Sequence, residues 1–120
     1  MAGFPEAVLD HFRNPRNSGE LSNATHRVAV TNPVCGDVLQ LAARVESGRI
    51  REVRFLCKGC TTSIACASWV TEFLAEKSLD QARNLTAETI SAGLGGLPEE
   101  TRHGATLAAD AVKALLQPAR

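Results

Sequence analysis

Apolar residues recur along the chain with two different periods, one typical of strands and the other of helices. Between positions 39 and 45 they occupy every second position, which predicts a strand with one buried face. The segment Glu46–Arg49 turns the chain, and Ile50 to Cys57 reads as the returning strand. We expect these two strands to form an antiparallel hairpin, with a further strand from His26 to Thr31.

Helical periodicity dominates the start of the chain and its second half. Phe4 to Phe12 reads as a short amphipathic helix, and residues 78–83 and 86–90 read as two more, the last opened by the capping residue Thr86. The glycine-rich segment 93–98 is expected to be a flexible connector. Two longer helices carry apolar stripes, one formed by Ile64, Ala67, Trp69, Val70, Phe73 and Leu74, the other by Leu107, Ala108, Ala111, Val112, Leu115 and Leu116.

The length, charge and hydropathy of the chain limit the number of domains and the kinds of partner it is expected to have. With 120 residues and 44% hydrophobic content, the chain is predicted to form one domain spanning residues 1–120. The 13 basic residues equal the 13 acidic ones, so no overall field attracts nucleic acid or an anionic membrane. The sequence start lacks the regions of a signal peptide, and no apolar run approaches the ~20 residues of a membrane span. We therefore expect a cytoplasmic protein with neither nucleic-acid nor membrane partners.

The four cysteines of a cytoplasmic chain indicate metal binding or reactivity rather than disulfides. Cys57 and Cys60 have the C-x-x-C spacing of zinc and redox sites, but Cys57 shares a strand face with Val53 and Phe55, which favours a buried, inert thiol. Cys60 lies just before a helix, whose positive end favours a thiolate and makes Cys60 a competent ligand or nucleophile. The hydroxyls of residues 61–63 are expected to cap this helix.

The hairpin brings further polar residues to Cys60. Cys35 and Asp37 precede its first strand, and Cys60 follows its second, so the three side chains are predicted to meet at one end of the sheet. An alternative is that the Cys-Gly-Asp triplet merely forms a turn in which Asp37 caps backbone groups. His11, on the first helix, is expected to be a solvated surface residue.

Four sequence motifs occur together in an order and spacing that resemble the IscU/NifU family of iron-sulfur cluster assembly scaffolds. The resemblance covers nearly the whole length and implies an α+β fold with a three-stranded antiparallel sheet, helices packed on one face and a metal site at one end. The motifs are Asp10–Gly19, Pro33–Asp37, Gly59–Cys60 with Ser63–Ala65, and Arg102–His103 with Leu107–Val112.

The same resemblance implies a ligand set by position. It consists of Cys35, Asp37, Cys60 and His103, and the family's third cysteine, which follows the histidine, is replaced here by Gly104. Four donors satisfy tetrahedral zinc, and histidine replaces cysteine on one iron of Rieske [2Fe-2S] centres. We therefore expect iron or a [2Fe-2S] cluster, with zinc as the alternative occupant. Cys66, about 120° from Cys60 around the helix, is expected to point away from the site.

The resemblance implies a scaffold or carrier, not an enzyme, that receives sulfide from a cysteine desulfurase and passes clusters to apo iron-sulfur proteins. Leu97–Thr101 carries acidic residues where a Leu-Pro-Pro-Val-Lys peptide marks chaperone-dependent relatives, which argues against a dedicated Hsp70 partner. Gly104 favours an alternative, a zinc-bound paralogue that regulates a desulfurase without building clusters. A further alternative is an enzyme with Cys60 as nucleophile and His103 as base.

Overall fold

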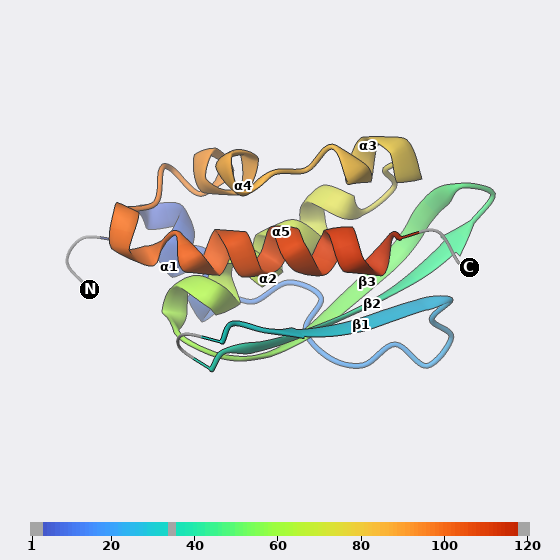
Figure 1. The fold of residues 1–120 in the computed structure, drawn as a ribbon, viewed down its shortest axis with the longest axis horizontal. Helices are drawn as coiled ribbons and strands as arrows, with labels where there is room; N and C mark the ends of the chain where they lie inside the picture. The colour runs from blue at the N-terminus through green and yellow to red at the C-terminus, as the bar shows by residue number, and fades with distance from the viewer. Residues whose placement is uncertain (1–3, 34–35, 118–120) are drawn as a thin grey trace.

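A computed structural model describes residues 4–33 and 36–117, and it forms a three-stranded sheet covered on one face by helices (Figure 1). This arrangement confirms the predicted α+β class. Both strand pairs are antiparallel, in the order β1-β2-β3. The elements are α1 (Glu6–Arg13), β1 (His26–Thr31), β2 (Val38–Glu46), β3 (Arg49–Lys58), α2 (Thr61–Leu74), α3 (Leu79–Arg83), α4 (Ala87–Gly93), the 3-10 turn η1 (Glu99–Thr101) and α5 (His103–Leu115).

The predicted hairpin is present as β2 and β3, and its register decides which side chains reach the core. Leu41 lies opposite Phe55 and Ala43 opposite Val53, and all four are at most 3% exposed. Ser47 and Gly48 turn the chain with φ values of 53° and 73°, as tight hairpin turns require. A register shift after Arg44 lets the strands twist without disturbing the end nearest residues 37 and 60.

Helix α2 is the centre of the molecule, with α1, α5 and β3 packed against it. The sequence predicted that one apolar face of this helix is buried. The structure buries the helix on almost every side, including the polar residues Thr62, Ser68 and Thr71. Ala65, Cys66, Ala67 and Ser68 are all completely buried, and these small side chains let the neighbouring elements approach closely. None of the helices in the described part of the chain has the length and apolar character needed to cross a bilayer.

The connector predicted for residues 93–98 is more constrained than its composition indicates. Gly93 is the last residue of α4, and a Cβ added there would lie 2.2 Å from Cζ2 of Trp69. Trp69 is itself fixed by stacking on Phe73, with ring centroids 5.2 Å apart. Leu94 and Leu97 are buried as well. Glycine at position 93 thus allows the α4 backbone to contact the indole directly.

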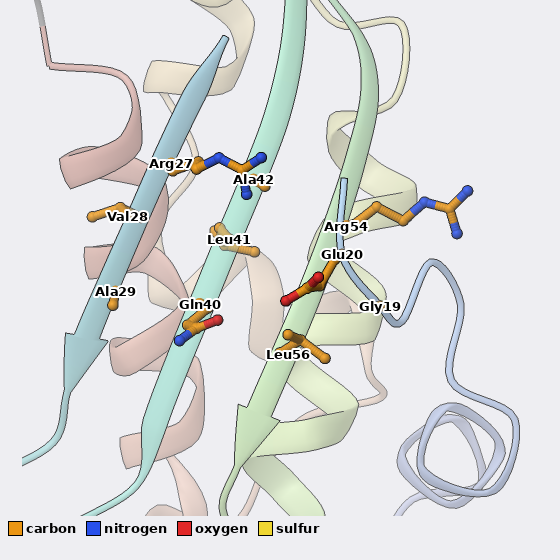
Figure 2. Close-up of a pocket in the computed structure, with 10 residues that line it drawn as sticks. All are labelled: Gly19, Glu20, Arg27, Val28, Ala29, Gln40, Leu41, Ala42, Arg54 and Leu56. Atoms are coloured by element: carbon orange, nitrogen blue, oxygen red, sulfur yellow. The ribbon is translucent and has the colours of Figure 1, made fainter. Parts of the chain in front are cut away.

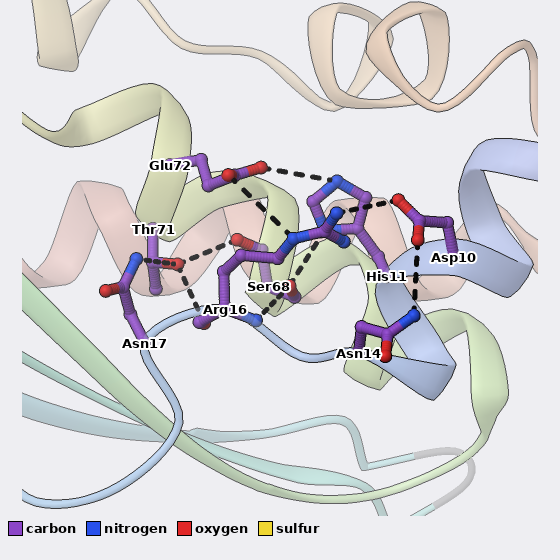
Figure 3. A network of polar contacts seen from close by, with 8 residues as sticks. All are labelled: Asp10, His11, Asn14, Arg16, Asn17, Ser68, Thr71 and Glu72. Carbon is purple, nitrogen blue, oxygen red and sulfur yellow. Dashed lines mark hydrogen bonds and ion pairs between the residues drawn. The ribbon is translucent and has the colours of Figure 1, made fainter.

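A network of polar contacts joins α1 and the following segment to α2 (Figure 3). Its centre is His11, which is only 7% exposed, so the expectation of a solvated histidine is wrong. Its Nδ1 lies 2.8 Å from Ser68 Oγ, and its Nε2 lies 3.5 Å from a carboxylate oxygen of Glu72. The backbone N–H of Arg16 donates to the same Ser68 hydroxyl at 2.9 Å. Hydrogen bonds therefore hold the chain against α2 after α1 ends.

The segment between α1 and β1 then crosses to the face of the sheet that carries no helix. Asn17 and Gly19 exchange backbone hydrogen bonds with Phe55 at the edge of β3, and Leu21 is buried beyond them. Arg27 donates to the Leu21 carbonyl at 2.6 Å, which fastens the segment to β1. A hollow of about 350 Å³ remains beside it, lined by Gly19, Glu20, Arg27, Val28, Ala29, Gln40, Leu41, Ala42, Arg54 and Leu56 (Figure 2).

The contact between Gly93 and Trp69 predicts that Gly93→Ala destabilises the fold. The added methyl group cannot fit without moving the indole or α4, which costs about 1–3 kcal/mol for overpacking of this kind. Urea unfolding followed by circular dichroism measures the change, and Ala92→Ser at the exposed neighbouring position serves as the control. An unchanged unfolding midpoint for Gly93→Ala would contradict the described packing.

Burial of His11 predicts a loss of stability in mild acid. Desolvation, followed by the nearby charge of Arg16, lowers the pKa of His11 below its ordinary value of 6.5. The unfolded chain therefore takes up a proton before the folded chain does, so stability falls as the pH drops below about 6.5 toward the folded-state pKa. Chemical unfolding between pH 7.5 and 5.5 measures this slope. His11→Gln should make the dependence of stability on pH less steep. An equally steep dependence in that variant would mean that other groups cause the loss of stability in acid.

Candidate metal centre

Three elements begin at one corner of the molecule, and a potential ligand lies at or just before the start of each. Cys60 is the N-cap residue of α2, His103 is the first residue of α5, and Asp37 immediately precedes β2. The positive ends of two helix dipoles therefore point toward the same space and stabilise negative charge there. The predicted hairpin geometry is borne out, because the chain before β2 does lie beside the chain after β3.

The turn before β2 determines where Asp37 lies. Gly36 has a φ of 77°, which glycine adopts without strain, and its N–H donates to the carbonyl of Asn32 at 2.8 Å. The Asn32 N–H donates in turn to the Asp37 carbonyl, also at 2.8 Å. Asp37 is only 9% exposed, so its carboxylate is directed into the protein rather than into solvent.

The potential donor atoms of Asp37, Cys60 and His103 all lie within 4.8 Å of one another. Cys60 Sγ is 3.7 Å from His103 Nε2. Ligand atoms around tetrahedral zinc at 2.0–2.3 Å are separated by about 3.3–3.8 Å, so a small closure of the three side chains would suit a metal ion. Oxygen, sulfur and nitrogen donors together fit zinc or iron better than magnesium or calcium. Cys35 lies outside the described residues, and its place in the ligand set remains a prediction.

Ser63 belongs to this corner, although its expected role as a capping residue is wrong. No side chain caps α2 at Cys60; instead, Ser63 Oγ donates to Asp37 Oδ2 at 2.6 Å and lies 3.4 Å from Cys60 Sγ. A residue three positions after the N-cap lies on the same side of the first helical turn. The sequence spacing alone could therefore have predicted that the Ser63 hydroxyl lies near Cys60. The hydrogen bond to Asp37 could not be predicted in this way, because it depends on long-range packing.

The other two described cysteines are not members of the three-donor group. Cys57 faces the helix-covered side of the sheet, opposite Leu39, and is partly buried. Burial, with a contribution from the negative charges of Asp37 and Cys60, raises the pKa of Cys57 to about 11. Cys66 is completely buried in the core, which raises its pKa to about 12. Both thiols stay protonated near neutral pH. Cys66 is a packed core thiol outside the donor group, in agreement with the expectation that it points away from the site.

Gly104 marks a close approach between the starts of α2 and α5. A Cβ at this position would lie 3.1 Å from both the backbone nitrogen of Ser63 and Cγ2 of Thr62. Any side chain here would require the two helices to separate by a few tenths of an ångström. The absence of a side chain at position 104 thus allows the starts of α2 and α5 to pack closely beside the three donors.

The chain is similar in sequence to one family of known proteins over most of its length. The sequence pattern of the NifU-like N terminal domain matches residues 4–118. The iron-sulfur cluster assembly scaffold protein IscU 1 of Archaeoglobus fulgidus is 38% identical over 110 residues, which cover 92% of this chain and 72% of that protein. IscU of Escherichia coli strain K12, also a cluster assembly scaffold protein, is 40% identical over 117 residues, covering 94% and 91%.

A solved structure, the N-terminal part of a nitrogen-fixing NifU-like protein from Brucella abortus, has the same fold. The TM-score is 0.72 at 19% identity, with 92% of this chain and 90% of that chain covered.

The packing of Asp37 against Gly59 predicts that Gly59→Ala weakens metal binding. A Cβ at position 59 would lie 2.9 Å from Asp37 Cγ and 3.0 Å from its Oδ2, so the carboxylate must move. We expect about a 10-fold loss of zinc affinity, the size typical of disturbing groups that orient a ligand. Competition with a chromophoric chelator measures it, with the exposed neighbour Lys58→Ala as control. Equal affinities for both variants would contradict this account.

Proposed function

This chain belongs to the family of NifU-like N-terminal domains, and on that premise we propose that it is a scaffold on which an iron-sulfur cluster is assembled and from which it is passed on. One observation carries the proposal. Asp37, Cys60 and His103 come from three separate segments, and their donor atoms lie within 4.8 Å of one another. Such convergence of carboxylate, thiol and imidazole suits a metal cargo.

The proposed ligands are Cys35, Asp37, Cys60 and His103. Cys60 and His103 come from the first turns of two long helices, so their backbones are held by the core rather than by a mobile loop. Asp37 comes from the turn before β2, which backbone hydrogen bonds between Asn32 and residues 36 and 37 hold together.

Two thiolates, one imidazole and one carboxylate favour a [2Fe-2S] cluster or iron over a cluster that needs four thiolates. Replacing cysteine by histidine at one iron raises the reduction potential of such a cluster. Zinc accepts the same four donors and is the competing occupant. Cys60 is exposed at the surface, so a second protein can reach its sulfur.

We propose a cysteine desulfurase as the sulfur donor and apo iron-sulfur proteins as the recipients. Both would approach the corner where α2 and α5 begin, because that is where Cys60 is accessible. The cargo is bound and released without being chemically consumed by the protein, so this role requires no turnover chemistry from the side chains.

Anaerobic reconstitution tests the proposal. The protein is mixed with ferrous iron, cysteine, a cysteine desulfurase and a thiol reductant that converts the delivered sulfur to sulfide, and visible absorption from sulfur-to-iron charge transfer is followed. We expect the absorption to develop in the natural protein and to be lost or strongly reduced in Cys35→Ala, Asp37→Ala, Cys60→Ala and His103→Ala. Cys66→Ala serves as the matched control, because this thiol is buried away from the site, and it should retain the absorption.

Failure of the natural protein to develop this absorption, with zinc retained and desulfurase activity altered, would instead identify a zinc-bound regulator. A requirement for Cys66 together with dispensability of His103 would mean that the proposed ligand set is wrong.

A further inference from the structure

We propose that Ser63 is a positioning residue of the metal site, holding Asp37 and Cys60 in place before the metal arrives. The inference rests on the proposed function only in treating Asp37 and Cys60 as ligands. Ser63 donates to Asp37 Oδ2 at 2.6 Å, and its oxygen is 3.4 Å from Cys60 Sγ. One hydroxyl therefore contacts two of the proposed ligands, which are separated by 23 positions in the sequence.

The burial of this hydroxyl makes the contact energetically important. Ser63 is 1% exposed, and Asp37 is 9% exposed, so water has little access to replace a broken bond. Hydrogen bonds to charged groups are shorter and stronger than those between neutral groups, and 2.6 Å is a length typical of them. The carboxylate is thus held in one orientation rather than sampling several rotamers.

The Ser63 hydroxyl connects the carboxylate to the sulfur. A serine hydroxyl has one proton, and here it is donated to Asp37 Oδ2. The oxygen of the same hydroxyl lies 3.4 Å from Cys60 Sγ. The orientation of the Ser63 side chain therefore sets the position of the carboxylate relative to the sulfur.

Two glycines hold Ser63 against this corner. A Cβ on Gly59 would lie 3.1 Å from Ser63 Cβ, and a Cβ on Gly104 would lie 3.1 Å from the Ser63 backbone nitrogen. The backbones of both glycines therefore pack directly around Ser63. Because position 104 carries no side chain, α5 can approach the backbone of Ser63 closely, which limits how far Ser63 can move away from Asp37.

Titration of the metal-free, reduced protein with Co²⁺ under anaerobic conditions tests the inference. Cobalt reports thiolate ligation by near-ultraviolet charge transfer and ligand geometry by its visible bands. We expect Ser63→Ala to weaken Co²⁺ binding about 10-fold or more and to shift the visible bands, because Asp37 is no longer held. Thr62→Val is the matched control, since it removes an equally buried hydroxyl from the same helical turn while preserving shape.

A double-mutant cycle separates positioning from general destabilisation. If Ser63 acts through the carboxylate, Ser63→Ala costs little further affinity once Asp37→Ala is present. Ser63→Thr, which retains the hydroxyl, should restore the cobalt spectrum of the natural protein. Equal Co²⁺ affinity in the natural and Ser63→Ala proteins would overturn the inference, and so would an undiminished effect of Ser63→Ala in the Asp37→Ala background.

The outcomes for this inference and for the proposed function are distinguishable. Strong Co²⁺ binding with the expected cycle, but no cluster in the reconstitution, would leave the role of Ser63 standing and remove the scaffold function. Cluster formation with no effect of Ser63→Ala on Co²⁺ binding would support the scaffold function and overturn the proposed role of Ser63. If the natural protein shows no thiolate-to-cobalt band at all, the proposed ligand set fails and the inference fails with it.

Discussion

The close packing of α2 against its neighbours is the constraint on which the rest of the structure depends. Small residues along this helix allow α1, α5 and the sheet to surround it, so its position cannot change without opening the core. Its first turn is consequently fixed relative to the end of the hairpin and to the start of α5. The candidate metal centre lies where these three ends meet. The positions of its ligands are therefore set by core packing around α2, some of it remote from the ligands.

Local patterns were sufficient to predict the elements and one long-range contact. Alternating apolar residues identified the hairpin, and hairpin geometry places Asp37 beside Cys60 regardless of other details. His103 could not be located in this way, because nothing in its own helix specifies which end of the sheet that helix reaches. The resemblance to a known family supplied that position, and the 3.7 Å separation from Cys60 agrees with it.

What could not be predicted depends on partners that are remote in sequence. His11 looks like a surface residue when its helix is considered alone, and it is buried only because Ser68 and Glu72 of α2 lie against it. Gly93 resembles any other flexible position until Trp69 is placed next to it. Ser63 likewise has the sequence context of a capping residue, while its actual partner, Asp37, comes from the other side of the hairpin. In each case one side chain has two plausible local roles, and tertiary packing selects between them.

The backbone pairing of Asn17–Gly19 with Phe55 has a consequence for self-association. This segment occupies the hydrogen-bonding groups of Phe55 on the outer edge of β3, and so hinders a strand from a second molecule from pairing there, a common route to aggregation. Within the described residues, β1 is then the strand whose outer edge has no neighbouring strand, and it is only six residues long. The two edges of the sheet thus each offer less than a full-length strand to a second molecule, one because β1 is short and the other because part of β3 is already paired.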